Sequence, residues 1–281
     1  MSRLAVNGAA LNVTSEGSGP VVLALHGFTG SVATWRGFTE AARGDFTVVA
    51  VDMLGHGASD APDDPARYTM ERCVEDLAGV LDHLGIRQAV WMGYSMGGRI
   101  ALACATIVPE RCAALVLEGA SPGLADEGER LQRMVNDEAL ARRILREGAR
   151  PFVDYWESIP LFASQARLSP EARATLRAQR LKNDARGLAN SLKGAGTGAQ
   201  PPVHDRLPSL DMPVLCVVGA EDTKFRAIGQ EMCRVLPKST LAVIPDAGHA
   251  THLEQPQQFN RTVLEFLRGL DLRDARPASK R

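Results

Sequence analysis

Short apolar runs recur along the chain, with polar and helical segments between them. The runs cover residues 21–25, 46–52, 89–93, 113–119, 214–219 and 241–245. Runs rich in β-branched residues that stay apolar at successive positions are typical of parallel strands buried on both faces. Residues 70–84 instead repeat apolar side chains with helical spacing, and Gly85 is expected to end that helix. Strands that alternate with helices predict an α/β fold with a mostly parallel, doubly wound sheet.

The alternation is interrupted at two places. Before Pro20, alternating apolar residues flank Asn7-Gly8, which predicts an antiparallel hairpin. Between Ser121 and Leu207 the chain is charged and helical in pattern, with no strand candidate. We therefore expect a helical cap at residues 121–206, inserted into a core of residues 1–120 and 207–281, over the carboxyl ends of the strands. The run GAGTGAQPP (194–202) is interpreted as a flexible return linker.

Composition narrows the class of protein. A formal net charge of -1 over 281 residues gives no overall field for nucleic acid or an anionic membrane surface, so neither partner is expected. No run approaches the ~20 apolar residues of a membrane span, and the N-terminus lacks the apolar stretch of a signal peptide. Five cysteines without a C-x-x-C pair favour reduced thiols and a cytoplasmic location. Oligomeric state has no signal in the sequence.

A G-x-S-x-G pattern at residues 93–97 indicates an activated serine. It follows a predicted strand and precedes a predicted helix, the context that a nucleophile elbow requires. Because a serine hydroxyl is barely ionised at neutral pH, Ser95 needs a base and an orienting acid. His249 and Asp222 each follow a later strand, in the chain order expected of an α/β-hydrolase triad.

Other residues compete for these roles. Glu118 also ends a strand and is the best rival acid, while Glu221 and Asp246 adjoin the predicted triad members. His249 and His252 form an H-x-x-H pair that could suggest a metal site. No third ligand of suitable type stands nearby, so we expect neither a metal nor a cofactor.

The segment LALHGFTGS predicts the part of the active site that would stabilise negative charge in the transition state. Its strand is followed by Phe28, whose backbone N–H could form an oxyanion hole together with the N–H of Met96. His26 in this loop is interpreted as a brace, and His56 in the glycine-rich loop DMLGHGASD as a structural residue.

Motifs along nearly the whole chain carry a family resemblance. HGFTG, DMLGHGASD, GYSMGG, GAEDTKF and AGHATHLEQP stand in the order found in the α/β-hydrolase superfamily, which the chain resembles. Narrower matches are GYSMGGR, LEGASPGL, DTKFRAI, the pair Arg130 and Arg133, and W-x-x-x-P-x-F-A-S at residues 156–164. Together these resemble one branch, the 2-succinyl-6-hydroxy-2,4-cyclohexadiene-1-carboxylate synthases of menaquinone biosynthesis.

The resemblance implies a lyase that acts on a small anionic substrate. Such an enzyme eliminates pyruvate from 2-succinyl-5-enolpyruvyl-6-hydroxy-3-cyclohexene-1-carboxylate, with Ser95, His249 and Asp222 serving proton abstraction. The family's substrate-binding positions match Tyr94, Arg99, Arg133, Trp156, Phe162 and Arg180. Arg177 is an alternative to Arg180, because the spacing from Phe162 differs by about three residues from the family pattern. The alternative for the arginines is that they are surface charges, and the alternative for the two aromatic residues is that they simply pack the cap onto the core.

Two other classes of function remain open at this point. A serine hydrolase, either a carboxylesterase or a C–C hydrolase on a small carboxylated substrate, would use the same fold and triad. A catalytically silent receptor is less favoured, because every triad member and both elbow glycines are present.

Overall fold

One mixed sheet forms the centre of the computed structural model, which describes residues 2–275. Residue 1 and residues 276–281 of the expected core lie outside the described residues. The strands are β1 (Ser2–Val6), β2 (Ala9–Gly17), β3 (Val21–Leu25), β4 (Thr47–Val51), β5 (Ala89–Tyr94), β6 (Cys112–Glu118), β7 (Val214–Gly219) and β8 (Ser239–Ile244). Their order is β1-β2-β4-β3-β5-β6-β7-β8. Only the β1–β2 and β2–β4 pairs are antiparallel, so the expected mostly parallel sheet is confirmed.

Helices separate the strands along most of the chain. The α-helices are α1 (Arg36–Ala42), α2 (Met70–His83), α3 (Met96–Ile107), α4 (Glu127–Glu147), α5 (Ala149–Ser158), α6 (Pro170–Arg180), α7 (Ala185–Ala195), α8 (Thr223–Val235), α9 (Thr251–Glu254) and α10 (Pro256–Arg268). The 3-10 helices are η1 (Val32–Trp35), η2 (Pro65–Tyr68), η3 (Pro109–Arg111), η4 (Pro160–Arg167) and η5 (His204–Ser209). Within residues 2–275, no helix is both long enough and apolar enough to cross a membrane.

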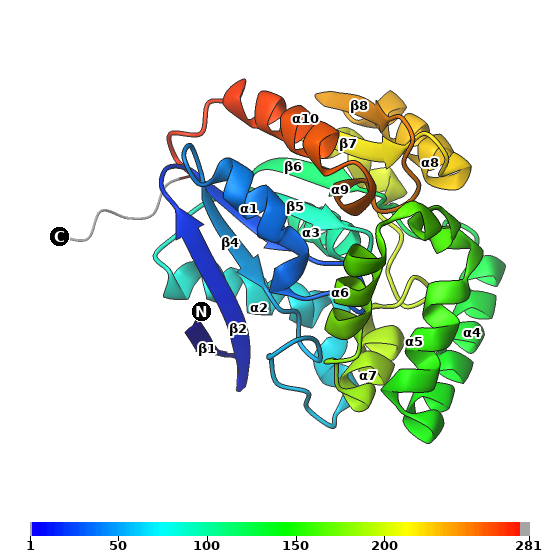
Figure 1. Cartoon of the computed structure of the whole chain (residues 1–281). Helices are drawn as coiled ribbons and strands as arrows, with labels where there is room; N and C mark the ends of the chain where they lie inside the picture. Colours follow the sequence, from blue (N-terminus) through cyan, green and yellow to red (C-terminus); the bar gives the residue numbers. More distant parts are fainter. Residues whose placement is uncertain (1, 276–281) are drawn as a thin grey trace.

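Two apolar layers sandwich the sheet, as the strand pattern requires. On β3, Leu23 and Leu25 belong to the layer that includes side chains of α2 and α3. Val22 and Ala24 point the other way, into the layer that includes α1 and α10. Figure 1 shows the two pairs of helices on opposite faces of the sheet. Because both faces are covered, the central strands are apolar at every position, which made them visible in the sequence.

Local turn chemistry fixes the first hairpin and the end of α2. Asn7 and Gly8 both have positive φ and join β1 to β2, so the predicted hairpin is confirmed. A two-residue turn of this kind suits Asn-Gly, because both residues tolerate the left-handed region. Gly85, with φ of 65°, follows α2 as predicted.

The inserted segment, residues 121–206, holds four α-helices and no strand. Figure 1 shows α4 to α7, in green and yellow-green, together at one side of the sheet. Ile144, Phe152 and Leu188 are completely or almost completely buried in a small apolar cluster of their own. The expected flexible linker at 194–202 is wrong: α7 extends to Ala195, and Gln200 is only 1% exposed.

Candidate active site

Ser95 lies at a sharp turn between β5 and α3. Its backbone has φ of 50° and ψ of -106°, a conformation that non-glycine residues rarely adopt and that stores strain. The turn demands small neighbours. A Cβ on Gly93 would lie 2.2 Å from the carbonyl carbon of Gly97, and a Cβ on Gly97 would lie 2.2 Å from the oxygen of Leu25. The two glycines therefore allow α3 to start directly against β3 and β5, with Ser95 at its head.

A chain of hydrogen bonds joins Ser95 to two residues from distant loops. His249 Nε2 lies 3.1 Å from Ser95 Oγ, and His249 Nδ1 lies 2.7 Å from Asp222 Oδ2. Asp222 Oδ1 also accepts a hydrogen bond from the N–H of Phe225, which holds the carboxylate at the start of α8. With the Nδ1 proton donated to Asp222, Nε2 is left to accept the serine proton. The structure thus brings together the three residues expected from the sequence.

Glu118, the rival acid, contacts a different histidine. It is fully buried and accepts hydrogen bonds from Thr251 Oγ1 at 2.7 Å and from His252 Nδ1 at 2.8 Å. Another rival, Glu221, forms an ion pair with Arg167. His252 is therefore tied to Glu118 and His249 to Asp222, so the H-x-x-H pair is divided between two carboxylates. The part of the chain that the structure describes holds no cluster of three or more metal-ligating side chains.

The two backbone N–H groups expected to form an oxyanion hole belong to residues that line the Ser95 cavity. Phe28 and Met96 both line the cavity that contains Ser95, and within the described residues neither N–H has a hydrogen-bond partner. His26 braces the Phe28 loop: its Nε2 accepts the Met53 N–H at 3.0 Å, and its Nδ1–H donates to the Gly27 oxygen at 2.7 Å. This arrangement leaves two donors free where a developing anion could be bound.

His26 and His56 are buried and neutral. Burial lowers the pKa of His26. Burial, followed by the neighbouring His26, lowers the pKa of His56 to about 3. The Nδ1–H of His56 donates to the Leu54 oxygen at 3.2 Å. The environment of both residues fits a structural part in the loops, as the sequence predicted.

The Ser95 cavity has a volume of about 290 Å³ and is walled by the core and the inserted segment. Five of the six positions expected to bind substrate line it: Tyr94, Arg99, Arg133, Trp156 and Phe162. Lys224 and Ser191, which sequence reasoning did not single out, line it as well. The available signal for Lys224 was its place in the DTKFRAI motif, two residues after Asp222.

Arg99 is a buried cation in this cavity. It is 8% exposed, and its Nη1 donates to Gln200 Oε1 at 3.0 Å. Burial, and then the nearby Arg133, lower its pKa to about 10. Among residues 2–275, no carboxylate forms an ion pair with Arg99. A buried guanidinium with only a neutral partner is suited to an anionic ligand, which would supply the missing countercharge.

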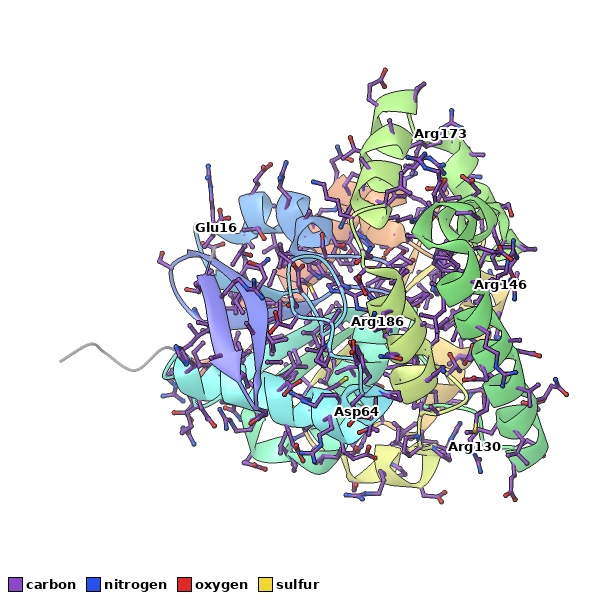
Figure 2. The ribbon with its side chains drawn as sticks, turned by 90° about the horizontal axis from the view of Figure 1, so that it is seen from below. Glu16, Asp64, Arg130, Arg146, Arg173 and Arg186 are labelled. Atoms are coloured by element: carbon purple, nitrogen blue, oxygen red, sulfur yellow. The ribbon has the colours of Figure 1, made fainter. Side chains whose placement is uncertain are left out.

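Arg133 reaches the same cavity from α4. Its Nε donates to Asp137 Oδ1 at 2.8 Å, one helical turn further along. Arg130, the other member of the sequence pair, is used differently. Its Nη1 donates to the backbone oxygens of Leu124 and Ala125 before the start of α4, and Figure 2 shows Arg130 near that end of the helix. Of the pair, only Arg133 lines the Ser95 cavity.

Arg180, the sixth expected position, does not line the Ser95 cavity. It packs against Phe162 and lines two other cavities. Its guanidinium stands 5.3 Å from the Phe162 ring centroid, and its Nη1 and Nη2 donate to Glu157 and Gln165 at 3.2 Å. Arg177, the alternative, is paired with two carboxylates, those of Asp154 and Glu157. Arg180 shares a cavity with Tyr94, whereas Arg177 does not.

The aromatic residues link the inserted segment to the core. The Trp156 ring lies 5.3 Å from that of Phe28 and 5.6 Å from that of Phe162, both edge-on. The buried Trp156 Nε1 has no hydrogen-bond partner within the described residues. Trp156 and Phe162 thus both pack the segment onto the core and border the cavity, so the two expectations for them are compatible.

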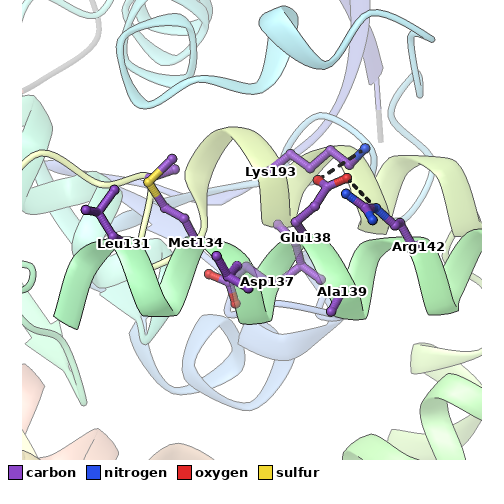
Figure 3. Close-up of a pocket in the computed structure, with 10 residues that line it drawn as sticks. Leu131, Met134, Asp137, Glu138, Ala139, Arg142 and Lys193 are labelled. Carbon is purple, nitrogen blue, oxygen red and sulfur yellow. Dashed lines mark hydrogen bonds and ion pairs between the residues drawn. The ribbon is translucent and has the colours of Figure 1, made fainter. Parts of the chain in front are cut away.

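A second cavity, of about 510 Å³, is lined mainly by residues of α4 and α7, and the only residue described above that lines it is the partner of Arg133. Figure 3 shows Glu138 bonded to Arg142 and Lys193 beside exposed apolar side chains of α4. Asp137 also lines it. Ser95 does not line this cavity.

The sheet, the strained serine turn and the Ser95–His249–Asp222 chain define a protein of the α/β-hydrolase class. A family model of the alpha/beta hydrolase fold matches residues 20–256. Among curated relatives, a Bacillus subtilis (strain 168) protein is 46% identical over 93% of this chain and 96% of its own length. Its name places it provisionally among the 2-succinyl-6-hydroxy-2,4-cyclohexadiene-1-carboxylate synthases. A Salmonella heidelberg (strain SL476) enzyme with that name, unqualified, is 33% identical over 92% and 98% of the two chains.

Solved structures of high similarity share the fold. MenH from S. aureus is 31% identical with a TM-score of 0.87, covering 92% of this chain and 97% of that one. A thermophilic esterase from Thermogutta terrifontis, with malate bound, is 32% identical with a TM-score of 0.83, covering 95% and 96%. This chain therefore belongs to the α/β-hydrolase fold family and, within it, to the family of 2-succinyl-6-hydroxy-2,4-cyclohexadiene-1-carboxylate synthases.

Proposed function

We propose that this protein is a lyase. It eliminates pyruvate from 2-succinyl-5-enolpyruvyl-6-hydroxy-3-cyclohexene-1-carboxylate and forms 2-succinyl-6-hydroxy-2,4-cyclohexadiene-1-carboxylate. The observation that carries the proposal is the end-to-end similarity to relatives that bear the synthase name, 46% identity over 96% of one of them. The buried Arg99 beside Ser95 supports it, because a neutral ester would leave that cation without a countercharge.

In the proposed reaction the Ser95–His249 pair takes a proton from a ring carbon. The electrons of that C–H bond, at ring position 2, form the 2,3 double bond, the existing 3,4 double bond shifts to 4,5, and the C–O bond from position 5 to the enolpyruvyl group breaks. The leaving enolate takes up a proton at carbon and departs as pyruvate, so no acyl-enzyme is required. Asp222 orients His249 and stabilises its charged form, in line with the 2.7 Å hydrogen bond between them.

The remaining site residues receive roles from their surroundings. The N–H groups of Phe28 and Met96 would form the oxyanion hole for negative charge that develops in the transition state. Arg99 and Arg133 would bind substrate carboxylates, and Tyr94, Trp156 and Phe162 would border the ring. Arg180 would act on the substrate less directly than the others, because it lines a separate cavity on the other side of Phe162.

We further propose that residues 121–206 act as a cap on a core of residues 1–120 and 207–281. Support comes from the four helices between β6 and β7 and from the side chains of both parts in one cavity wall. We also propose a cytoplasmic location, because the cysteines are all free and mostly buried, as is typical of proteins in a reducing compartment.

A serine hydrolase is the second candidate, favoured by one observation. The esterase from Thermogutta terrifontis is nearly as similar in fold as MenH and slightly more similar in sequence. The same Ser95–His249–Asp222 chain could attack an ester carbonyl and form an acyl-enzyme. Arg99 then has no evident use unless the ester also carries a carboxylate.

Product analysis separates the two candidates. Purified protein is incubated with the enolpyruvyl precursor, and both pyruvate release and the ultraviolet absorbance of the new diene are followed. We expect the two signals to rise together, while nitrophenyl esters turn over poorly. Rapid ester turnover without pyruvate release would overturn the lyase proposal. Ser95→Ala abolishes both activities and so serves only as a blank.

A further inference from the structure

The turn that presents Phe28 is strained. The Gly27 oxygen accepts the Gly30 N–H at 2.9 Å, so Phe28 and Thr29 are the two central residues of a tight turn. Thr29 has φ of 69°, at a position where a turn with positive φ normally carries glycine. A β-branched residue in this region is strained and keeps its conformation only where its surroundings enforce it. The contacts of Thr29 therefore identify what holds the turn.

Asn183 from the inserted segment makes the most direct of these contacts. Its Nδ2 donates to the Thr29 oxygen at 2.8 Å and to the Arg180 oxygen at 3.0 Å. Its Oδ1 accepts the Gly57 N–H at 2.9 Å. Asn183 is 5% exposed, and it lies just after α6, 154 residues away from Thr29 in the chain. One buried amide thus ties together the end of α6, the strained turn and the glycine-rich loop that follows β4.

A second side chain from the end of α6 reinforces this contact. Gln179 Nε2 donates to Ser31 Oγ at 2.8 Å and to Thr34 Oγ1 at 3.1 Å. Ser31 itself caps η1, directly after the turn. Two amides of the inserted segment therefore hold the turn and the residues that follow it, so a shift of this end of α6 is transmitted to Phe28.

We propose that Asn183 is a positioning residue that holds the Phe28 N–H in place through the strained Thr29 turn. The inference rests on the oxyanion role proposed above for that N–H. Without the Nδ2 donor, Thr29 relaxes toward negative φ and the Gly27–Phe28 peptide moves away from Ser95. A displacement of about 1 Å in such a group is enough to slow a reaction by about a hundredfold.

Asn190 provides a matched control. It is also 5% exposed, comes from the same inserted segment, and donates to core-loop oxygens, those of Pro62 and Asp63, at 3.2 and 3.1 Å. It makes no contact with the Phe28 turn. We expect Asn183→Ala and Asn190→Ala to lower the melting temperature to a similar extent. Only Asn183→Ala is expected to lower kcat, by about ten- to a hundredfold, with KM changed less than about threefold.

Two further variants separate positioning from simple loss of structure. Asn183→Asp keeps the acceptor for Gly57 and removes the donor to Thr29, so kcat should fall as in Asn183→Ala. Adding Thr29→Gly to Asn183→Ala should restore part of the rate, because glycine adopts positive φ at no steric cost. Equal kcat values for Asn183→Ala and Asn190→Ala, or no rescue by glycine, would overturn the proposal.

The rate at which a fluorophosphonate probe labels Ser95 makes the test independent of the natural reaction, because labelling uses the same oxyanion hole. Labelling of Asn183→Ala should be slower than that of the unaltered protein and of Asn190→Ala. If labelling is slowed while the unaltered protein releases no pyruvate, the proposed lyase function fails and the role of Asn183 stands. If Asn183→Ala is labelled at the normal rate and the unaltered protein releases pyruvate, the role of Asn183 fails and the lyase function stands.

Discussion

Glu118 is the last residue of β6 and Asp222 follows the neighbouring β7, and each accepts a hydrogen bond from a different histidine. Only the histidine bound to Asp222 reaches Ser95, so we expect the two acids to have separable roles. Asp222→Asn should lower kcat by about 10⁴, because an amide favours the wrong tautomer of His249. Glu118→Gln should leave kcat within about tenfold and lower the free energy of unfolding by about 1–3 kcal/mol, since Thr251 and His252 lose a buried charged partner. Pyruvate release and urea unfolding measure the two effects, and similar kcat losses in both variants would contradict the assignment.

Arg99 is the residue that distinguishes an anionic substrate from a neutral one. A hydrogen bond to a charged group contributes about 1.5–3 kcal/mol, so Arg99→Ala should lower kcat/KM for the anionic precursor by about 10- to 150-fold. Hydrolysis of a neutral nitrophenyl ester should change far less. Arg130→Ala is the control, because Arg130 does not line the Ser95 cavity and its Nη1 donates to the backbone oxygens of Leu124 and Ala125. Equal losses with the anionic and the neutral substrate would show that Arg99 supports the fold and not the choice of substrate.

At the scale of elements, α3 packs closely against β3 only because the residues of its first turn are small. A Cβ on Gly97 would collide with the Leu25 oxygen, so Gly97→Ala must push α3 away from β3. We expect it to lower the free energy of unfolding by more than about 3 kcal/mol. A Cβ added to Gly37 in α1 would have no atom within 4 Å. Gly37→Ala should therefore raise the free energy of unfolding by about 0.5–1 kcal/mol. Urea unfolding of both variants checks this, and a mild effect at Gly97 would contradict the close approach.

The core strands were predictable because each is apolar on both faces, a pattern that local sequence reveals. Their predicted ends differ from β4, β5 and β6 by one residue, and the largest difference falls at β8, whose first residues Ser239 and Thr240 are polar. The reactive residues were predictable for a related reason: a strand end and a glycine-rich turn fix where Ser95, Asp222 and His249 must emerge.

The inserted segment was harder, because its contacts depend on packing between residues far apart in the chain. Gln200 lies in a stretch that local composition marks as a linker, yet it orients Arg99, 101 residues earlier. Arg180 matched a family position, but a cation–π contact with Phe162 and a bond to Glu157 hold it outside the Ser95 cavity. Helical propensity predicts that a segment forms helices; it does not predict which helix face meets the core.

For the whole molecule, the two halves of the site have different origins. The core supplies reactive groups on strand ends, and the inserted segment supplies Arg133, Trp156 and Phe162 to the same cavity. Asn183 and Gln179 connect the segment to the Phe28 turn, so its packing influences the core's reactive loop. We therefore expect substrate binding by the segment and stabilisation of charge in the core to be linked through these hydrogen bonds.

Acid should destabilise the whole molecule through its buried histidines. The pKa of His56 is lowered from 6.5 to about 3, and burial also lowers that of His26. Below pH 6.5 the unfolded chain binds protons that these folded histidines do not, so the free energy of unfolding falls as pH falls. For His56 this fall is about 1.4 kcal/mol per pH unit and continues to about pH 3. Urea unfolding at about pH 7 and pH 5.5 should show a smaller loss for His56→Gln than for the unaltered protein, because the variant lacks one of the two groups. Equal losses would mean that His56 is not the neutral, buried group that its contacts describe.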